Sequence, residues 1–235
     1  GFSSHASFTR AFKEAYGISP EKYRKDRPML NTCEKPELSM RYHLVDEGVP
    51  LIAGDIVLEI RRMRLTEPEW YLGLETAVEI KKQVPAGEST GIDVPGQLWK
   101  AFHEKKPAVD GLEMGMSHKA DPEMGTFLYF AGALSERGTE YAGAEERSAK
   151  DGFPLVKREL PAGEYLVCRI EAETFEKLVT AALDQAGVYL FGTWLPAHGL
   201  TFLPFSAEKY FLKNEDDIYM EIWVMPAPAT EQDVK

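Results

Sequence analysis

Cysteine is scarce in this chain of 235 residues, which contains only Cys33 and Cys168. So few cysteines exclude a fold held together by several disulfides, and neither stands in a CxxC or cysteine–histidine spacing that would hold zinc. Stability must therefore come from an apolar core, which a chain of this length with 44% hydrophobic residues can bury. We expect no metal site and no bound cofactor.

Long apolar stretches are also missing. No run approaches the ~18 apolar residues of a membrane span, and the first residues lack the charged-then-apolar pattern of a secretory leader. The motifs of several enzyme classes are absent as well, since the chain has no nucleophile elbow, HExxH, P-loop or GxGxxG. These absences favour a cytoplasmic protein without a membrane partner, and they favour a role other than catalysis.

Charge is distributed unevenly along the chain. Residues 1–28 carry a net charge of +3, which leaves −14 for the remainder of a chain whose total is −11. A basic front can approach phosphate groups, whereas an acidic body repels nucleic acid and tolerates cations. The alternative is that the acidic surface serves solubility alone.

The first 28 residues predict two short helices. Residues 3–16 have an amino end that Ser3 or Ser4 can cap, and Phe8, Ala11, Phe12 and Ala15 share one face at helical spacing. Gly17 then ends this helix. Ser19 and Pro20 are typical of the cap and first position of a second helix, which carries Tyr23 and ends before Pro28.

This front segment resembles the end of an AraC/XylS-type DNA-binding domain. The matching elements are Gly1-Phe2, Ser4, Phe8, Arg10, Phe12-Lys13, Gly17, Pro20 and Tyr23-Arg24. The resemblance implies a helix that lies in a major groove, with base-facing positions at His5, Ala6, Thr9 and Arg10, and Arg10 is able to contact guanine with two hydrogen bonds. The alternative is a short amphipathic helix with a solvated polar face.

A helix-turn-helix also needs a first helix that braces the second. We therefore interpret residues 1–28 as a remnant of such a domain, and we expect DNA to be a partner of the full-length protein only. Residues 29–55 are rich in proline and mixed charges, so we interpret them as a linker with one strand-like stretch at Met40–Val45. Residues 227–235 are expected to be a tail.

The body, residues 56–226, shows one order of elements twice. The first half predicts strands at 56–60 and 69–75, a helix that begins at Pro95, and strands at 112–116 and 126–133. The second half predicts strands at 155–160 and 164–170, a helix over 174–186 with Thr174 as cap, and strands at 208–212 and 218–225. The pattern fits a duplicated strand–helix–strand–strand unit.

The body resembles the gyrase-inhibitor-like (GyrI-like) effector-binding domain. The matching elements, in order, are Gly73-Leu74, Leu98-Trp99 with Phe102, Tyr129–Gly132, Leu160–Tyr165, Thr193–Pro196, Glu208–Tyr210 and Met220–Val224. The resemblance implies an α+β fold of the SHS2 type, in which two copies of βαββ are related by a pseudo-twofold axis and enclose a ligand cleft. One departure is that Trp223–Pro226 is one residue longer than the usual strand-to-proline pattern.

Two strands suggest the lining of such a cleft. Alternation places Tyr219, Glu221 and Trp223 on one face of the last strand, and Glu208 and Tyr210 on one face of the strand before it. A buried carboxylate between aromatic rings is costly unless it is paired or serves a ligand, and the rings favour a flat or cationic guest. The candidate ligand-binding residues are Glu221, Trp223, Glu208, Tyr210, Trp99, Tyr129, Tyr165 and Trp194. The alternative is that the aromatics are core and Glu221 faces water.

These observations predict a ligand-sensing domain that binds a lipophilic or cationic small-molecule effector and couples binding to DNA recognition. The resemblance also implies a rival from another class, because some GyrI-like domains are hydrolases that use a cleft glutamate, and Glu221 is the candidate base. A third interpretation is a module that binds a protein partner through its acidic surface, which strong salt dependence would reveal. Regulators of this kind often form homodimers, although nothing in the sequence marks a dimer surface.

Overall fold

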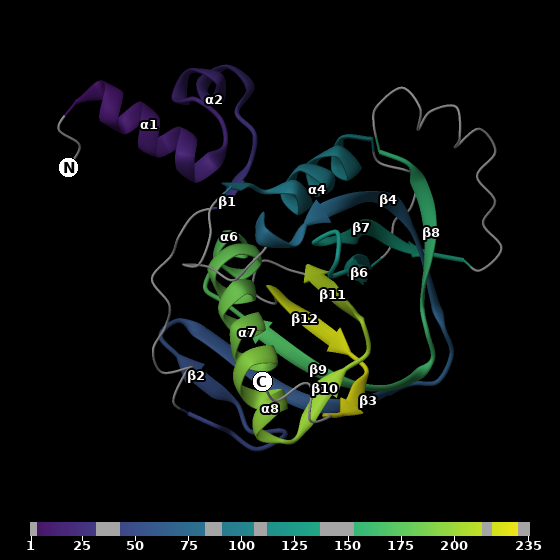
Figure 1. Ribbon diagram of the computed structural model, residues 1–235. Coiled ribbons are helices and arrows are strands. Elements are labelled where there is room, and N and C mark those ends of the chain that lie inside the picture. The colour runs from purple at the N-terminus through teal and green to yellow at the C-terminus, as the bar shows by residue number, and fades with distance from the viewer. Residues whose placement is uncertain are drawn as a thin grey trace.

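A computed structural model of the chain describes residues 4–31, 43–82, 91–105, 112–136, 153–212 and 218–229. Its centre is an antiparallel sheet whose strands differ in length. In spatial order the nine strands are β2 (Leu51–Ala53), β3 (Ile56–Leu65), β9 (Gly163–Glu171), β12 (Ile218–Val224), β11 (Phe205–Leu212), β6 (Glu113–Asp121), β7 (Thr126–Ser135), β4 (Glu69–Glu79) and β8 (Leu155–Leu160). The α+β class expected from the sequence is confirmed (Figure 1).

Helices cover one face of this sheet. Helix α4 (Val94–Lys105) packs its buried Leu98 and Phe102 against β4 and β7. A second, longer helical stretch covers β9 and β12 and alternates between α-helical and π-helical turns. Its segments are α6 (Phe175–Lys177), η2 (Leu178–Ala182), α7 (Leu183–Tyr189), η3 (Leu190–Trp194) and α8 (Leu195–Ala197). Thr174 caps it as expected, with its side chain accepting a hydrogen bond from the Lys177 N–H.

The long helix does not end at residue 186 as the sequence predicted. It continues for three more turns because Tyr189, Leu190 and Trp194 bury their side chains, each 1% exposed or less, against the sheet. Gly187 lies within the helix and has no positive φ, so it does not act there as a terminator. Tertiary packing has overridden the local stop signal.

The sheet order relates the two halves of the body. Each half is a strand, a helix and a hairpin, namely β4–α4–β6–β7 and β9–α6 to α8–β11–β12. The two halves meet at β11 and β6, and the spatial order runs β9, β12, β11, β6, β7, β4. The strand that precedes each half pairs with the first strand of the other half. β3, which precedes β4, pairs with β9, and β8, which precedes β9, pairs with β4.

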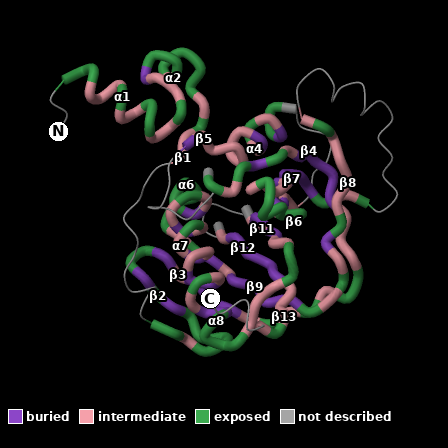
Figure 2. The backbone as a smooth tube through the Cα atoms, viewed as in Figure 1, coloured by how far each residue is buried: buried purple, intermediate pink, exposed green. Residues whose placement is uncertain are grey.

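Alternating side chains divide the buried residues between the two faces of the sheet. On β12, Met220, Ile222 and Val224 belong to the core beneath the long helix, whereas Trp223 belongs to a core on the opposite face, with Tyr71, Phe130 and others. A third cluster lies beneath α4. Figure 2 shows the buried residues concentrated along the central strands. A period of two along each strand therefore divides the candidate site residues between opposite faces.

Short strands complete the body. β1 (Leu30–Asn31) pairs with β5 (Gly91–Ile92), β10 (Leu200–Phe202) pairs with β13 (Pro226–Pro228), and a 3-10 turn, η1 (Ile80–Lys82), follows β4. Parts of the expected linker thus join sheets of the body. The strand predicted at Met40–Val45 is wrong for residues 43–45, which have no regular structure, while residues 40–42 lie outside the described residues.

Two helices precede the body, as predicted. α1 (His5–Tyr16) is capped by Ser4 and ends at Gly17, whose φ is +72°. α2 (Pro20–Asp26) is capped by Ser19 and has Pro20 in its first turn. The Phe12 ring lies 5.8 Å from those of Phe8 and Tyr23, yet no residue of α1 is buried. The Phe12 ring therefore packs against the rings of Phe8 and Tyr23.

Within the described residues, no helix is long and apolar enough to cross a membrane. The same part of the chain contains no group of three or more histidine, cysteine, aspartate or glutamate side chains arranged to hold a metal ion.

Candidate functional site

Six of the eight candidate ligand-binding residues form two clusters around two glutamates on opposite faces of the sheet. Strand β11 pairs with β12 so that Glu208 stands opposite Ile222 and Lys209 stands opposite Glu221. Since neighbouring positions point to opposite faces, Glu208 lies on the helix-covered face and Glu221 on the other. The expected single site is therefore two separate environments.

The Glu208 cluster combines three elements that are distant in sequence. Tyr129 of β7 and Tyr210 of β11 each donate a hydroxyl hydrogen bond to Oε2 of Glu208 at 2.9 Å. The Trp99 indole N–H, from α4, donates to the Tyr129 hydroxyl oxygen at 3.0 Å. The Trp99 ring also meets the Tyr210 ring edge-on, with centroids 5.2 Å apart. We call Glu208, Tyr129, Tyr210 and Trp99 the carboxylate cage.

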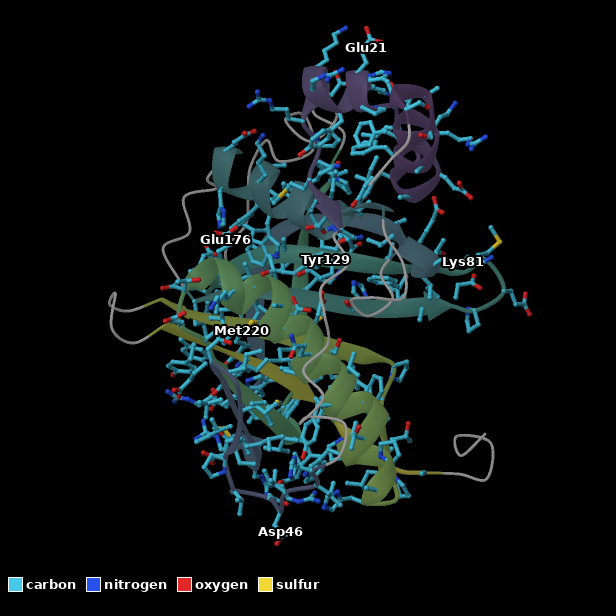
Figure 3. All side chains as sticks on the ribbon, turned by 90° about the vertical axis from the view of Figure 1, so that its left-hand side faces the viewer. Glu21, Asp46, Lys81, Tyr129, Glu176 and Met220 are labelled. Atoms are coloured by element: carbon cyan, nitrogen blue, oxygen red, sulfur yellow. The ribbon has the colours of Figure 1, made fainter. Side chains whose placement is uncertain are left out.

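The two tyrosines of the cage are almost fully buried, at 4% and 8% exposure, whereas Glu208 and Trp99 are partly exposed. Tyr129 is labelled in Figure 3, which shows it near the middle of the molecule, beyond one end of the long helix. The cage thus combines two buried tyrosines with two residues that are partly exposed. Four of the predicted residues meet here.

Glu208 has no positive partner within the described residues, since every hydrogen bond it receives comes from a neutral hydroxyl. Burial raises the pKa of its carboxyl, the two tyrosine hydrogen bonds lower it in part, and the charge of Asp93 raises it further. Burial also raises the pKa of Asp93 and takes the pKa of both tyrosines well above the usual value. The tyrosines therefore remain neutral donors, and no positive side chain among the described residues balances the Glu208 carboxylate when it is ionised.

The chemistry of the cage suits a cation with apolar substituents. An uncompensated carboxylate in partly apolar surroundings is costly, and a positive guest would relieve that cost. The faces and edges of three aromatic rings add cation–π and apolar contact. The alternative use of such a group is proton transfer, because a raised pKa makes a carboxylate a stronger base toward water.

The Glu221 cluster on the opposite face is neutralised by the chain itself. Glu221 is 3% exposed and accepts hydrogen bonds from Arg61 at 2.9 Å and from the Trp223 indole at 2.8 Å. Lys209 is 2% exposed, lies 3.8 Å from the Trp223 ring centroid and pairs with Glu69 at 2.7 Å. Each charge in this cluster therefore has an opposite charge beside it.

Two other predicted residues serve packing. Tyr165 is fully buried beside Trp223, with ring centroids 5.2 Å apart, and its hydroxyl donates to the Pro161 carbonyl at 2.6 Å. Trp194, in the η3 segment of the long helix, is buried against the sheet and donates its indole N–H to the Val45 carbonyl at 2.9 Å. Neither has a hydrogen bond or ring contact to the carboxylate cage within the described residues.

A third carboxylate was not anticipated from the sequence. Glu75 of β4 is 7% exposed and receives two hydrogen bonds from Arg158 of β8 and one from His118 of β6. Burial raises the pKa of its carboxyl, but the His118 and Arg158 hydrogen bonds outweigh burial and bring it to about 2. Glu75 thus forms a structural ion pair with Arg158, as Glu221 does with Arg61. The partners were missed because they come from strands far apart in sequence.

The residues expected to face DNA lie on α1. His5, Ala6 and Arg10 are exposed, whereas Thr9 is partly buried and its hydroxyl has no hydrogen-bond partner within the described residues. Three of the four predicted positions are therefore accessible on the surface of this helix.

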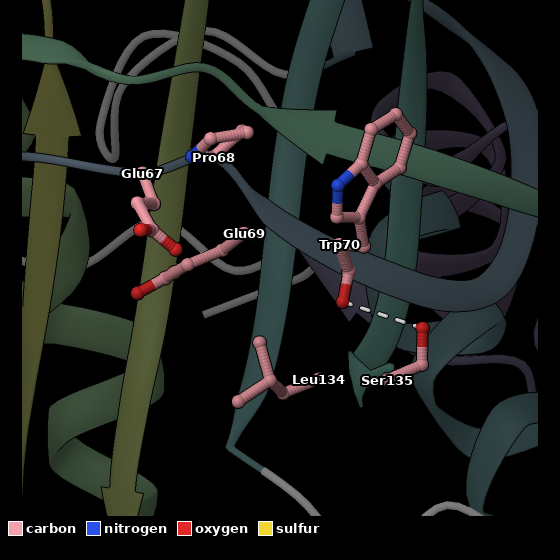
Figure 4. Close-up of a pocket in the computed structure, with 6 residues that line it drawn as sticks. All are labelled: Glu67, Pro68, Glu69, Trp70, Leu134 and Ser135. Atoms are coloured by element: carbon pink, nitrogen blue, oxygen red, sulfur yellow. Dashed lines mark hydrogen bonds between the residues drawn. The ribbon is translucent and has the colours of Figure 1, made fainter. Parts of the chain in front are cut away.

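A shallow surface pocket of about 460 Å³ lies away from the cage, at the start of β4 and the end of β7. It is lined by Glu67, Pro68, Glu69, Trp70, Leu134 and Ser135. Figure 4 shows the Glu67 and Glu69 side chains extending to the same side, while the Ser135 hydroxyl bonds the Trp70 carbonyl. The Glu69 carboxylate already has Lys209 and Tyr71 as partners, and the other carboxylate of the lining, Glu67, is exposed. The pocket therefore offers no partly buried carboxylate without a partner, although the Trp70 indole N–H has no hydrogen-bond partner within the described residues.

Comparisons with models of protein families and with curated protein sequences found no match. Among solved structures, similar chains include the integron cassette protein VCH_CASS2 of Vibrio cholerae, at 13% identity over 72% of this chain and 95% of that chain, with a TM-score of 0.47. SAV2435 bound to tetraphenylphosphonium matches at 12% identity, 74% and 96% coverage and a TM-score of 0.45. The EcmrR C-terminal domain matches at 14% identity, 73% and 98% coverage and a TM-score of 0.41. At these values the likeness assigns this chain neither a ligand nor an activity.

Proposed function

We propose that this chain is the effector-binding part of a bacterial transcription regulator and that the carboxylate cage binds a lipophilic organic cation. The observation that carries the proposal is that Glu208 has no positive partner within the described residues, although Glu221, Glu69 and Glu75 each have one. A ligand would complete the cage as Arg61 completes the Glu221 cluster. The partly exposed Trp99 gives that ligand a place to stack.

The cage is also connected to the two N-terminal helices. Helix α4, which carries Trp99, begins directly after Asp93, and the Asp93 N–H donates to the Met29 carbonyl at 2.9 Å. β1, which follows α2, pairs with β5 just before α4. A ligand that favours one position of α4 would therefore favour one position of the segment that leads to α1 and α2. Such a shift is limited by the difference in affinity between the two positions.

The regulator is proposed to be of the AraC type, with DNA bound by the full-length protein through a domain that includes α1, and with a GyrI-like body. The sequence resemblances and the accessible His5, Ala6 and Arg10 support this. The matching order of elements in β4–β7 and β9–β12 supports a duplicated βαββ unit with pseudo-twofold symmetry. A homodimer is part of the proposal, although no surface is assigned to it.

The test compares two ligands of one shape and opposite charge. Tetraphenylphosphonium and tetraphenylborate are titrated against the whole chain by isothermal calorimetry and tryptophan fluorescence. The wild type is expected to bind the cation at least 10-fold more tightly, and Glu208→Gln is expected to remove most of that difference, since a neutral amide gives no net attraction. The control is Glu164→Gln, which removes one charge from a side chain that is 60% exposed.

Equal binding of the two ions, or an unchanged preference in Glu208→Gln, would refute a cation site at Glu208. The preference in Glu164→Gln should remain that of the wild type, because the charge of an exposed side chain is screened by solvent and salt.

Hydrolysis of a small molecule is the second candidate function, and the raised pKa of Glu208 is the observation that favours it. We propose that, in this case, Glu208 would act as the base toward water, a role for which the sequence analysis named Glu221. The test is incubation with a series of chromogenic esters, followed by mass spectrometry. Cleavage that is lost in Glu208→Gln would replace the sensor proposal with this one, and recovery of intact compounds would reject hydrolysis of those esters.

A further inference from the structure

Gly115 of β6 occupies the centre of the sheet beneath the carboxylate cage. It stands directly opposite Glu208 of β11 on one side and Ala131 of β7 on the other. Its backbone is extended and its φ is not positive, so any residue could adopt its conformation. Glycine weakens a strand because it has no side chain to pack and loses more conformational freedom. The reason for glycine here must therefore be space.

Tyr129 occupies that space. Its strand, β7, is separated from β11 by β6, so its hydroxyl has to cross β6 to donate to Glu208 at 2.9 Å. A Cβ on Gly115 would lie 3.1 Å from Cζ of Tyr129, 2.9 Å from Oε2 of Glu208 and closer still to the Tyr129 hydroxyl oxygen. The Tyr129 hydroxyl can pass over β6 at this position because Gly115 has no Cβ.

The Tyr129 side chain has little freedom to move away. It is 4% exposed, packs in the cluster beneath α4, and is held by the Trp99 indole N–H at 3.0 Å. The same oxygen of Glu208, Oε2, also accepts a hydrogen bond from the Tyr210 hydroxyl. A methyl group at position 115 would therefore have to break the Tyr129–Glu208 hydrogen bond or displace the carboxylate.

We infer that Gly115 is a positioning residue of the cage: its missing side chain lets Tyr129 reach across β6 and fix the carboxylate of Glu208 toward an incoming ligand. This inference rests on the proposed function where it concerns the ligand. The placement of Glu208 by Gly115 and Tyr129 stands without it. Gly115 touches no ligand itself, and it acts through the two side chains above it.

The experiment is a double-mutant cycle of Gly115→Ala and Tyr129→Phe on the whole chain. Removal of the hydroxyl leaves the new methyl group against Cζ of Tyr129 and the end of the flexible Glu208 side chain, which can shift by a few tenths of an ångström. Gly115→Ala is expected to weaken tetraphenylphosphonium binding at least 10-fold. The double variant is expected to bind no worse than Tyr129→Phe alone. Binding losses that multiply in the double variant would overturn the inference, because the two residues would then act independently.

A second readout needs no ligand. The Glu208 carboxyl is titrated by NMR in each variant. Because the Tyr129 hydrogen bond lowers the Glu208 pKa, Gly115→Ala should raise that pKa in the same direction as Tyr129→Phe, and the double variant should match Tyr129→Phe. A wild-type Glu208 titration in Gly115→Ala would overturn the inference. If the wild type does not bind the cation, the cation site fails and this titration alone decides the role of Gly115.

The control for adding a methyl group is Gly187→Ala. Gly187 lies within α7, and a Cβ there would meet no atom within 4 Å. This variant should retain the wild-type Glu208 titration and the wild-type affinity. If Gly115→Ala does not fold, the double variant still tests the inference, because recovery of folding on removal of the Tyr129 hydroxyl is the expected result and failure to recover contradicts it.

Discussion

Glu208 and Glu221 lie on neighbouring strands of one sheet, yet their carboxylates have different kinds of hydrogen-bond partner. Glu221 is paired with Arg61 and bonded by Trp223. Glu208, on the other face, is bonded only by neutral hydroxyls within the described residues. Both carboxylates have aromatic neighbours, so aromatic surroundings alone do not indicate a ligand site. The presence or absence of a cation supplied by the chain distinguishes the two.

This difference gives opposite expectations for stability and binding. A buried ion pair is damaged most when one partner is removed, because the other charge stays buried without compensation. A carboxylate that lacks a partner already destabilises the folded state, so its removal should leave the free energy of unfolding unchanged or raise it. The variants below test whether the two faces of the sheet follow this division.

The largest effect is expected when Glu221 loses its cation. Arg61→Met should lower the free energy of unfolding by about 2–4 kcal/mol, since it leaves a buried carboxylate unpaired. Urea unfolding followed by circular dichroism measures this. The matched control is Arg62→Met, whose ion pair with Glu47 is exposed and should contribute about 1 kcal/mol or less. Equal losses in the two variants would mean that the Glu221 pair is no more important than a surface pair.

The next effect compares the two glutamates directly. Glu221→Gln should lower the free energy of unfolding by about 1–3 kcal/mol because Arg61 loses its charged acceptor. Glu208→Gln should leave it within about 0.5 kcal/mol or raise it, since no cation is orphaned and a partly buried charge is removed. Unfolding of both variants in the same urea series at neutral pH provides the measurement. A loss in Glu208→Gln as large as that in Glu221→Gln would indicate an undetected partner for Glu208.

Much of the fold follows from local sequence patterns. Alternation along 218–225 and 208–212 predicts which side chains share a face, and Glu208 and Tyr210 do lie together. Capping residues such as Ser4 and Thr174 mark the starts of helices. The end of the long helix could not be predicted locally, because Tyr189 and Trp194 are kept helical by the core that they fill.

The site depends on the order of strands, which no local pattern contains. Tyr129 and Trp99 meet Glu208 because β6 lies between β7 and β11 and because α4 covers that part of the sheet. Glu221 is neutralised by Arg61, which lies 160 residues earlier in the chain. The sequence therefore predicted the residue types of a site and named Glu208, but it could not tell which glutamate already had a partner.

A smaller effect is expected from pH. Burial raises the pKa of Glu208, so the carboxyl becomes protonated at a higher pH than an exposed glutamate. Once it is protonated, a cation can bind beside the carboxylate only if Glu208 first loses its proton. Affinity for tetraphenylphosphonium should therefore be full above the Glu208 pKa and fall by up to about 10-fold per pH unit below it. Calorimetry from about pH 8 to about pH 5 measures this.

Two variants test whether Glu208 is the group whose protonation changes the affinity. Glu208→Gln should flatten the profile, and Asp93→Asn should change it less, because Asp93 acts on Glu208 only through its charge. A profile that remains steep in Glu208→Gln would assign the proton to another group and would break the link between the raised pKa and the cage.

The smallest effect is expected at the rim of the cage. Trp99→Phe removes the N–H that orients the Tyr129 hydroxyl and part of the edge-on contact with Tyr210. We expect a loss of affinity of about 2–5-fold, consistent with one neutral hydrogen bond of about 0.5–1 kcal/mol. Trp70→Phe is the matched control, since Trp70 lies outside the cage and its indole N–H has no partner within the described residues. Fluorescence titration of both variants should separate them. If Trp70→Phe weakens binding as much as Trp99→Phe, the cation is held near the pocket at the start of β4 and not over Glu208.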